Sequence, residues 1–323
     1  MTTGLFPTVV PATRGAAPAV RVVGTVEEFS AALDLARSLG QVVGLVPTMG
    51  ALHAGHRSLI ERAAAECDVV AVTIFVNPLQ FGETSDIEHY PRTFDADVAV
   101  AGDSGAAVVF APSVEEMYPG FPAVVATSVS VAGVSDGWEG SSRPGHFDGV
   151  ATVVAKLFAM AGRCRAYFGE KDFQQLAVVR RMARDLSFPV EIVGCDTVRD
   201  TDGLALSSRN VRLSADERTA ATVLSRALRA GAAAMARSGT SVEEVEGCMA
   251  RVVAGEPSVA LDYAAVVRSD DLSRPGSLDG PGPFRLLIAA QVGPVRLIDN
   301  LDPAPPAVPV GAMRSADDGE GTV

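Results

Sequence analysis

The chain has 323 residues, more than one hydrophobic core usually organises, so a large domain and a smaller one are expected. Lysine and arginine number 27 against 39 aspartates and glutamates, and the net charge of −12 argues against a nucleic-acid binder, which needs a basic face. No apolar stretch approaches the roughly 18 residues of a membrane span, and four widely spaced cysteines without a Cys-x-x-Cys pair favour reduced thiols in a cytoplasmic protein.

The N-terminal part of the chain begins with a loose segment and then changes to an alternating pattern. Residues 1–20 are rich in proline, glycine, alanine and threonine and are expected to form a flexible extension. Thr25 starts a helix with the spacing of a capping box. The apolar run 41–46 predicts a strand that ends at a proline, and the amphipathic stretch 57–66 predicts the next helix. Residues 69–76 are β-branched and apolar throughout, which is typical of a buried parallel strand.

The same alternation continues toward the middle of the chain. Strand-like and helix-like runs follow one another as a strand at 106–110, a helix at 149–161, a strand at 166–168, a helix at 173–186 and a strand at 190–193. This alternation predicts an α/β fold, with a Rossmann-like doubly wound parallel sheet over residues 21–197.

The pattern changes after about residue 198. Capping boxes at Ser214 and Ser241 begin two helices, the first of them long and rich in alanine and arginine. Three strand-like segments follow, at 259–268, 284–292 and 295–301. Helices followed by a meander predict a small α+β domain over 198–302, which could close as a lid. The tail 303–323 is rich in proline and then acidic, so it is expected to be disordered.

The segment 47–56, PTMGALHAGH, follows the first predicted parallel strand, and ligands bind beyond the carboxyl ends of such strands. His53 and His56 are three apart, so they share one face of a helical turn. Gly50 and Gly55 allow a ligand close to the backbone, and the N-terminus of the following helix suits a phosphate. The alternatives are capping or core histidines, or a zinc site, for which a third ligand is missing.

The string His-Ala-Gly-His resembles the His-x-Gly-His signature of the nucleotidylyltransferase superfamily, and the longer segment is similar to the pantothenate synthetase family, with a resemblance that spans residues 43–300. The resemblance implies ATP-dependent condensation of D-pantoate with β-alanine to pantothenate, with release of AMP and pyrophosphate, through a pantoyl adenylate. It also implies Mg²⁺ and a homodimer. His53 and His56 would then stabilise the phosphate oxygens of ATP as charge builds.

Neutral amides follow the second strand at Asn77 and Gln80. Such groups can orient a small polyol acid, although an Asn-Pro turn with an exposed glutamine explains the pattern equally. The resemblance implies that Gln80 and Gln175 bind pantoate, with Asn77 close by. Tyr90 and Arg143 are further candidates, and the planar fork of Arg143 could anchor a carboxylate or phosphate.

Acidic residues near a phosphate site often bind Mg²⁺, which prefers oxygen ligands. Asp95 and Asp97 lie in such a segment, and similar enzymes commonly carry two adjacent acids where this chain has Ala96 and Asp97. Asp97 is therefore the candidate metal ligand. The alternative is a solvated first turn of a helix, where acidic residues are common.

Lys171 stands in the segment YFGEKDFQQL and is one of two lysines in the chain. Its ammonium could neutralise the charge of a triphosphate, although a charged surface turn has the same composition. The resemblance implies that Gly169 and Asp172 bind the ribose of ATP, and that the backbones near Met49 and Val198 frame the nucleotide.

Ser207, Ser208 and Arg209 place two hydroxyls and a guanidinium in a row. The resemblance implies that this segment is a mobile loop that binds the β- and γ-phosphates and acts catalytically with the histidines and Lys171, while Gly55 contributes to ATP binding. Two other readings remain open. One is a nucleotidylyltransferase with another acceptor, which would not need the amide groups, and the other is a non-catalytic nucleotide-binding paralogue.

Overall fold

The computed structural model describes residues 20–81, 87, 90–123, 125–279 and 283–304. The predicted N-terminal extension and C-terminal tail lie outside these ranges, apart from residue 20 and residues 303 and 304. The chain divides into two compact units. The first unit comprises the chain up to Ala132 with Gly140–Glu170 and Val178–Val198, and the second comprises Gly133–Glu139, Lys171–Ala177 and the chain from Arg199 onward.

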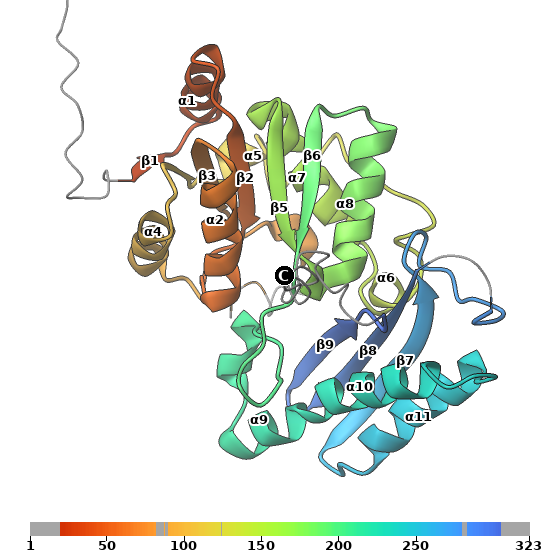
Figure 1. Ribbon diagram of the computed structural model, residues 1–323. Coiled ribbons are helices and arrows are strands. Elements are labelled where there is room, and N and C mark those ends of the chain that lie inside the picture. The colour runs from red at the N-terminus through yellow and green to blue at the C-terminus, as the bar shows by residue number, and fades with distance from the viewer. Residues whose placement is uncertain (1–19, 82–86, 88–89, 124, 280–282, 305–323) are drawn as a thin grey trace, which may run out of the picture. The chain divides into compact units, whose positions relative to one another are not determined.

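The first unit is built on a parallel six-stranded sheet with the order β1-β4-β3-β2-β5-β6 (Figure 1). The strand order reverses between β2 and β5, which makes this point the topological switch of a doubly wound fold. The predicted α/β fold class is confirmed. The strands are β1 (Arg21–Val23), β2 (Val43–Thr48), β3 (Val69–Ile74), β4 (Val108–Phe110), β5 (Cys164–Gly169) and β6 (Val190–Cys195).

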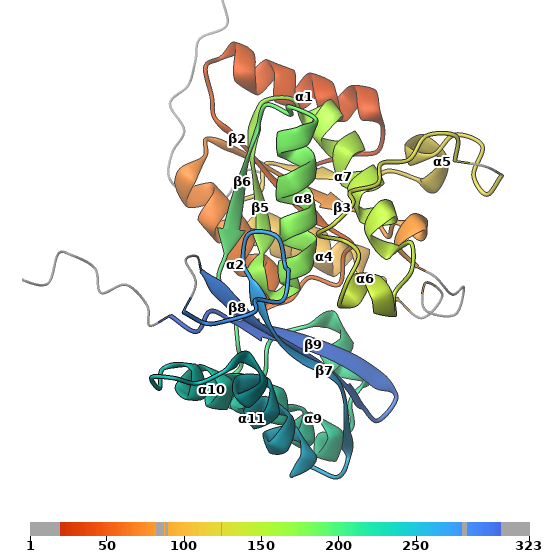
Figure 2. The same ribbon diagram turned by 90° about the vertical axis from the view of Figure 1, so that its right-hand side faces the viewer.

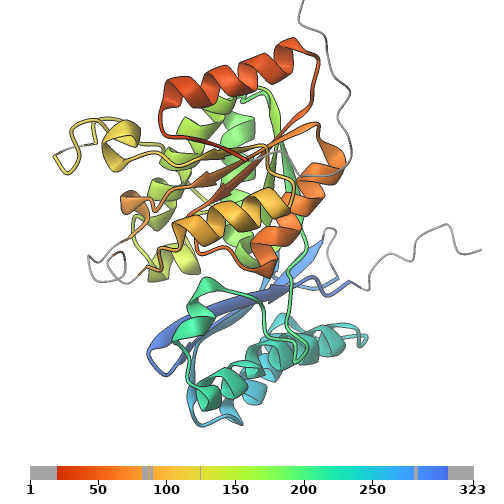
Figure 3. The same cartoon turned by 90° about the vertical axis from the view of Figure 1, so that its left-hand side faces the viewer.

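Helices cover both faces of this sheet. Figure 2 shows α1 beside α7, and Figure 3 shows α1 and α4 on opposite faces. On the α2 face, Ile60 and Ala63 pack on Val46 and Val72 in one buried cluster, and each large aliphatic side chain buried there contributes about 1.5–3 kcal/mol. The helices of the unit are α1 (Val26–Ser38), α2 (Ala54–Glu66), α4 (Phe94–Asp103), α5 (Val114–Met117), α7 (His146–Ala161) and most of α8 (Phe173–Asp185), with the short η1 (Pro78–Gln80).

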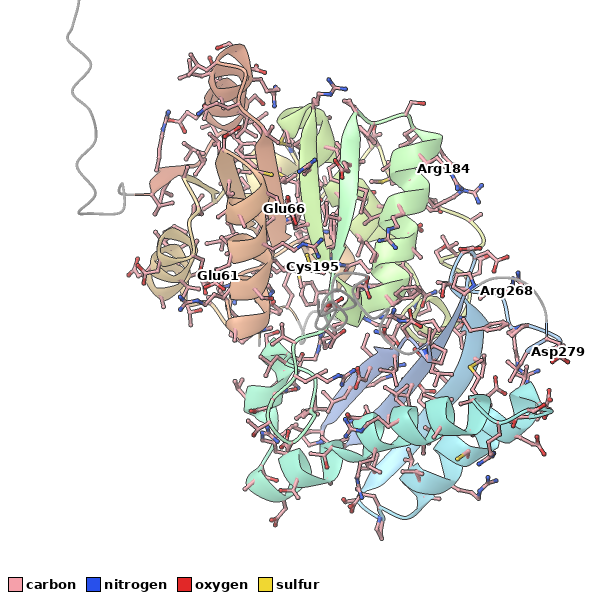
Figure 4. All side chains as sticks on the ribbon, in the orientation of Figure 1. Glu61, Glu66, Arg184, Cys195, Arg268 and Asp279 are labelled. Atoms are coloured by element: carbon pink, nitrogen blue, oxygen red, sulfur yellow. The ribbon has the colours of Figure 1, made fainter. Side chains whose placement is uncertain are left out.

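The exposed side of α2 carries two ion pairs at helical spacing, Arg57 with Glu61 and Arg62 with Glu66. Figure 4 shows Glu61 and Glu66 along this helix. Such solvated pairs add only a few tenths of a kcal/mol each to a helix. Their polar side chains leave the opposite face of α2 to bury its apolar residues against the sheet.

The second unit is an antiparallel sheet of β7 (Val259–Arg268), β8 (Phe284–Val292) and β9 (Val295–Leu301), with the bounds predicted from the sequence. Figure 1 shows α10 (Val223–Met235) and α11 (Val242–Ala254) side by side on one face of it. Leu224, Leu228, Met249 and Ile288 form the buried layer between helices and sheet. The short elements are α6 (Glu139–Ser142, only its first residue in this unit), η2 (Glu170–Asp172), η3 (Ser208–Arg212) and α9 (Ala215–Ala221).

Several element boundaries differ from the predictions by two or three residues, as in α7, which begins at His146 rather than at residue 149. Strand β2 runs through Pro47 to Thr48, because β5 pairs with β2 only at Gly44 and Leu45 and demands no N–H from Pro47. The long helix expected after Ser214 is broken at Thr222 into α9 and α10. The hydroxyl of Thr222 bonds back to the carbonyl of Thr219 at the break. Helix α2 begins at Ala54 rather than at residue 57. Among the described helices, none combines the length and apolar character needed to cross a membrane.

Candidate functional site

The loop between β2 and α2 is shaped by two left-handed residues and a buried carboxylate. Gly50 has a φ of 87° and Ala51 a φ of 51°. Asp97, on the first turn of α4 and only 3% exposed, accepts hydrogen bonds from the amides of Ala51 (3.0 Å) and Leu52 (2.7 Å). Thr93 donates its hydroxyl to the same carboxylate at 3.1 Å. The charge of Asp97 therefore offsets the backbone strain of this turn and fixes the loop that leads into the histidines.

The two histidines form a reciprocal cap at the N-terminus of α2. His53 is the N-cap residue, and its Nδ1 accepts the amide N–H of Gly55 at 3.1 Å. The Nδ1 of His56 accepts the amide N–H of His53 at 3.3 Å, and the two ring centroids lie 4.2 Å apart. Because each Nδ1 accepts, each neutral imidazole carries its proton on Nε2. Both rings thus hold a donor nitrogen at a helix N-terminus, where an anion is favoured.

The segment after β3 contains the two predicted amides. The side chain of Asn77 is fully buried and caps η1 by accepting the amide N–H of Leu79. Its Nδ2 donates to Gln80 Oε1 at 2.9 Å and to the carbonyl of Gly149 at 3.0 Å. The polar atoms of the Asn77 side chain are therefore satisfied within the protein, and Gln80 beside it is also buried, with 7% of its surface exposed.

Arg143 and His146 hold the backbone of Gln80. His146 Nδ1 lies 2.9 Å from the carbonyl oxygen of Gln80, which can only accept, so Nδ1 is the donor. Arg143 Nη1 then donates to His146 Nε2 at 3.1 Å, and its Nη2 lies 3.4 Å from the same carbonyl. The predicted candidate Tyr90 stacks edge-on with Phe81, with ring centroids 5.9 Å apart. Within the first unit, Arg143 and Gln80 are thus brought together.

The carboxyl ends of β2, β3 and β5 meet at one edge of the parallel sheet. Strand β2 pairs with β3 along its whole length and with β5 near its start. The residues that follow these strands are Met49 after β2, Asn77 after β3 and Gly169 at the end of β5. Val198 follows β6, the neighbour of β5. This edge contains the switch point, where doubly wound sheets bind nucleotides.

In the second unit, Lys171 and Asp172 are neighbours in η2, with Nζ and Oδ1 3.3 Å apart. The side chain of Asn300, on β9, donates to the carbonyl of Lys171 at 2.8 Å and so holds this turn. The two glutamines that follow differ in role. Gln174 is buried and bonds to the backbone of Glu139 and of the 134–137 turn, whereas none of the described residues forms a hydrogen bond to the side chain of Gln175.

Ser207, Ser208 and Arg209 lie at the start of η3 in the same unit. The hydroxyl of Ser207 accepts the amide N–H of Arg209 at 3.2 Å, which caps the short helix. All three side chains are half-buried. The approach to η3 is anchored by Arg199, which forms a two-pronged ion pair with buried Asp299 at 2.6 and 2.9 Å. The ion pair with Asp299 of β9 thus holds the backbone that leads into residues 207–209.

The carboxylate of Asp97 has both oxygens occupied by loop hydrogen bonds. Nowhere in the described ranges do three or more histidines, cysteines, aspartates or glutamates gather as a metal cluster. Asp97 therefore has a clear structural role, and its assignment as a metal ligand stays a prediction. Mg²⁺ would be held here mainly by substrate phosphates and water, since it needs few protein oxygens.

Four residues around the site were missed by sequence reasoning: Tyr118, His146, Arg199 and Asn300. Tyr118, His146 and Asn300 each bond to a predicted residue from a distant part of the chain, such as Asn300 to Lys171, whereas Arg199 pairs with Asp299, which was not predicted either. A lone tyrosine or asparagine carries no spacing signal. His146 lies three residues after the predicted Arg143, and Arg199 directly follows the predicted Val198.

The chain is similar in sequence and in fold to known proteins. The sequence model of the family described as Pantoate-beta-alanine ligase matches residues 21–302. A protein of Rubrobacter xylanophilus named pantothenate synthetase is 55% identical over 269 residues, which cover 82% of this chain and 92% of the relative. A crystal structure of pantothenate synthetase from Thermus thermophilus is 48% identical, with a TM-score of 0.82 and coverage of 88% of this chain and all of that one. A pantoate-β-alanine ligase from Francisella tularensis, solved with β,γ-ATP and β-alanine, is 32% identical with a TM-score of 0.70, covering 88% and 98%.

Proposed function

The chain belongs to the pantoate–β-alanine ligase family, and from that premise we propose how its residues divide the work of joining pantoate to β-alanine. The enzyme is a ligase that uses ATP to condense D-pantoate with β-alanine. The observation that carries the residue assignment is the reciprocal cap of His53 and His56 at the switch point of the sheet, which leaves each ring with its proton on Nε2.

In the first step, a carboxylate oxygen of pantoate attacks the α-phosphorus of ATP in line. The new P–O bond forms as the bond to the pyrophosphate oxygen breaks, giving pantoyl adenylate and pyrophosphate. The pantoate carboxylate is already an anion near neutral pH, so no general base is needed. Catalysis in this step is positioning and charge neutralisation.

The residues take part as follows. His53 and His56 donate Nε2–H to the α- and β-phosphate oxygens as negative charge builds. Lys171 and Arg209 offset the negative charge of the departing pyrophosphate, and the hydroxyls of Ser207 and Ser208 donate hydrogen bonds to it. Mg²⁺ would be held by the phosphates and would supply further positive charge. Gly55 contributes its backbone beside the phosphates, and Met49 and Val198 frame the nucleotide while Gly169 and Asp172 bind the ribose.

Pantoate is held by Gln80 and Gln175. Asn77 acts on pantoate through Gln80, because its own hydrogen-bonding positions are occupied within the protein. In the second step, the deprotonated amine of β-alanine attacks the acyl carbon, the bond to the AMP oxygen breaks, and the amine loses a proton. The adenylate is a mixed anhydride prone to hydrolysis, so the site must exclude water. We further propose a homodimer in the cytoplasm, and a lid role for residues 198–302.

The test is release of AMP and pyrophosphate with ATP, Mg²⁺ and D-pantoate, with and without β-alanine, and the mass of the product. Turnover that requires both D-pantoate and β-alanine, and that yields a product with the mass of pantothenate, supports the proposed reaction. Product without an amide bond would favour a different nucleotidylyltransferase, and absence of pyrophosphate would favour a non-catalytic paralogue.

Two substitutions test the residue roles. His53→Ala and Lys171→Ala should each lower kcat about 10²–10³-fold, the effect of removing one donor to a developing oxyanion. The matched control is Arg184→Ala, which removes an exposed cation of α8 (Figure 4) and should leave turnover unchanged. Near-normal turnover of His53→Ala or Lys171→Ala, in a folded protein, would remove that residue from the mechanism.

A further inference from the structure

Three buried polar side chains form a hydrogen-bonded chain that ends at Gln80. The hydroxyl of Tyr118 donates to Asn77 Oδ1 at 2.9 Å, and Asn77 Nδ2 donates to Gln80 Oε1 at 2.9 Å. Their exposed fractions are 4%, 0% and 7% in that order. Tyr118 stands just after α5, 41 residues from Asn77. A chain of this kind in the interior orients each member strongly, because an unpaired buried polar group is costly.

The orientation of the Asn77 amide is set by two backbone groups that allow one arrangement. The carbonyl of Gly149 can only accept a hydrogen bond, so it must face Nδ2 of Asn77. The amide of Leu79 can only donate, so it must face Oδ1. Exchanging the oxygen and nitrogen of Asn77 would break both bonds at once.

The direction of the rest of the chain follows from Asn77. Its second Nδ2 hydrogen points at Gln80, whose facing atom must therefore be the acceptor Oε1. Its second Oδ1 lone pair faces Tyr118, whose hydroxyl must therefore donate. Burial raises the pKa of the Tyr118 phenol, so the proton needed for this bond is retained across the physiological range.

We propose that Tyr118 is a positioning residue: its hydroxyl satisfies the second lone pair of Asn77 Oδ1 and holds Asn77 in place, and Asn77 fixes the side-chain amide of Gln80 with Nε2 turned toward pantoate as a hydrogen-bond donor. This inference rests on the proposed function. The backbone of Gln80 is already held by His146, so only the orientation of its side-chain amide remains to be fixed. Among the residues that the structure describes, none accepts a hydrogen bond from Gln80 Nε2.

The surroundings of Tyr118 and Asn77 keep the chain rigid. The phenol ring packs against Phe75, with centroids 6.1 Å apart, and the ammonium of Lys156 lies 5.9 Å from its centroid. A Cβ on Gly149 would collide with the carbonyl oxygen of Leu79, so only glycine allows α7 and η1 to approach this closely.

The chain also determines which group a substrate must offer. A donor nitrogen at the edge of the site selects an oxygen acceptor, such as a hydroxyl or carboxylate oxygen of a hydroxy acid. A substrate that placed a second donor there would leave two buried donors facing each other, and sites of this kind reject such analogues strongly. Specificity for the hydroxy acid is thus fixed by Tyr118 and Asn77, which do not touch it.

The test compares Tyr118→Phe with the wild-type enzyme in steady-state assays that vary pantoate and ATP separately. We expect the KM for pantoate to rise about threefold to tenfold, the effect of one weakened hydrogen bond, while the KM for ATP stays unchanged. The matched control is Tyr167→Phe. This substitution removes another buried hydroxyl, which bonds to Glu66 (Figure 4) and Cys67 rather than to Asn77 or Gln80. It should leave the KM values for pantoate and for ATP unchanged.

Asn77→Ser provides a second variant, because serine still caps η1 but cannot reach Gln80. It should raise the KM for pantoate more than Tyr118→Phe, again with the KM for ATP unchanged. Unchanged KM for pantoate in a folded Tyr118→Phe, or in Asn77→Ser should Tyr118→Phe not fold, overturns this inference alone. A wild-type enzyme that does not consume pantoate overturns the proposed function as well, so the two failures are distinguishable.

Discussion

Replacing Asp97 by asparagine separates two roles that a carboxylate in this position could have. In the structure, one oxygen accepts the amide of Ala51 and the other accepts the amide of Leu52 and the hydroxyl of Thr93. Asparagine has the same shape but only one acceptor oxygen. Its amino group would have to face a backbone N–H, so the substitution removes one charged hydrogen bond and sets two donors against each other.

The size of the effect follows from these contacts. A hydrogen bond to a charged group contributes about 1.5–3 kcal/mol, and leaving a buried amide unsatisfied costs a comparable amount that partly overlaps with it. We therefore expect Asp97→Asn to lower the free energy of unfolding by about 2–4 kcal/mol. For a unit of this size, the corresponding fall in Tm is about 5–15 °C. Turnover should fall too, because the loop that carries His53 loses its anchor.

The assay is thermal or urea unfolding with and without Mg²⁺, together with the Mg²⁺ dependence of turnover. The control is Asp95→Asn, an exposed neighbour on the same first turn of α4, which loses only a helix-dipole interaction of about 0.3–1 kcal/mol. If Asp97→Asn keeps full stability but needs far more Mg²⁺ for turnover, the anchoring argument is wrong and Asp97 is a metal ligand.

Further predictions concern packing and ionisation. Gly149→Ala should destabilise the protein by at least about 1–3 kcal/mol in urea unfolding, because its Cβ would meet the backbone of Leu79 and Gln80, whereas Gly137→Ala, with nothing within 4 Å, should be nearly neutral. Burial raises the pKa of Cys164 from 9.0 to about 12, so the folded state prefers the thiol. The stability from this preference is complete below pH 9 and is lost as the pH rises toward 12, so Cys164→Ala should flatten the alkaline fall in stability measured by urea titration. A wild-type curve equal to that of the variant would contradict this.

The elements that could be predicted are those whose signal is local. The three strands of the second unit and the capping boxes at Thr25, Ser214 and Ser241 were predicted from alternation and from spacing within four residues. The strand β1 was missed because three residues at a sheet edge carry no periodicity. The histidine pair was read as ligands on one face of a helical turn, with a capping role as the alternative, and the cap is what the structure shows. The helix start was placed late because imidazole is an unusual N-cap group.

In the candidate site, too, some residues could be predicted from the sequence and others could not, and this difference has a physical cause. The residues proposed to meet the ligands lie in short segments after strands, since the carboxyl ends of parallel strands collect at one edge, and this can be read along the chain. The residues that orient them are buried partners from distant segments, such as Tyr118 for Asn77 and Asp97 for the turn at Ala51. Their identities are ordinary, and only the fold makes them neighbours. Because an interior hydrogen bond is directional and expensive to leave unmade, these partners determine which atom each ligand-facing group presents. Substitutions that conserve every ligand-facing residue can therefore still alter substrate specificity.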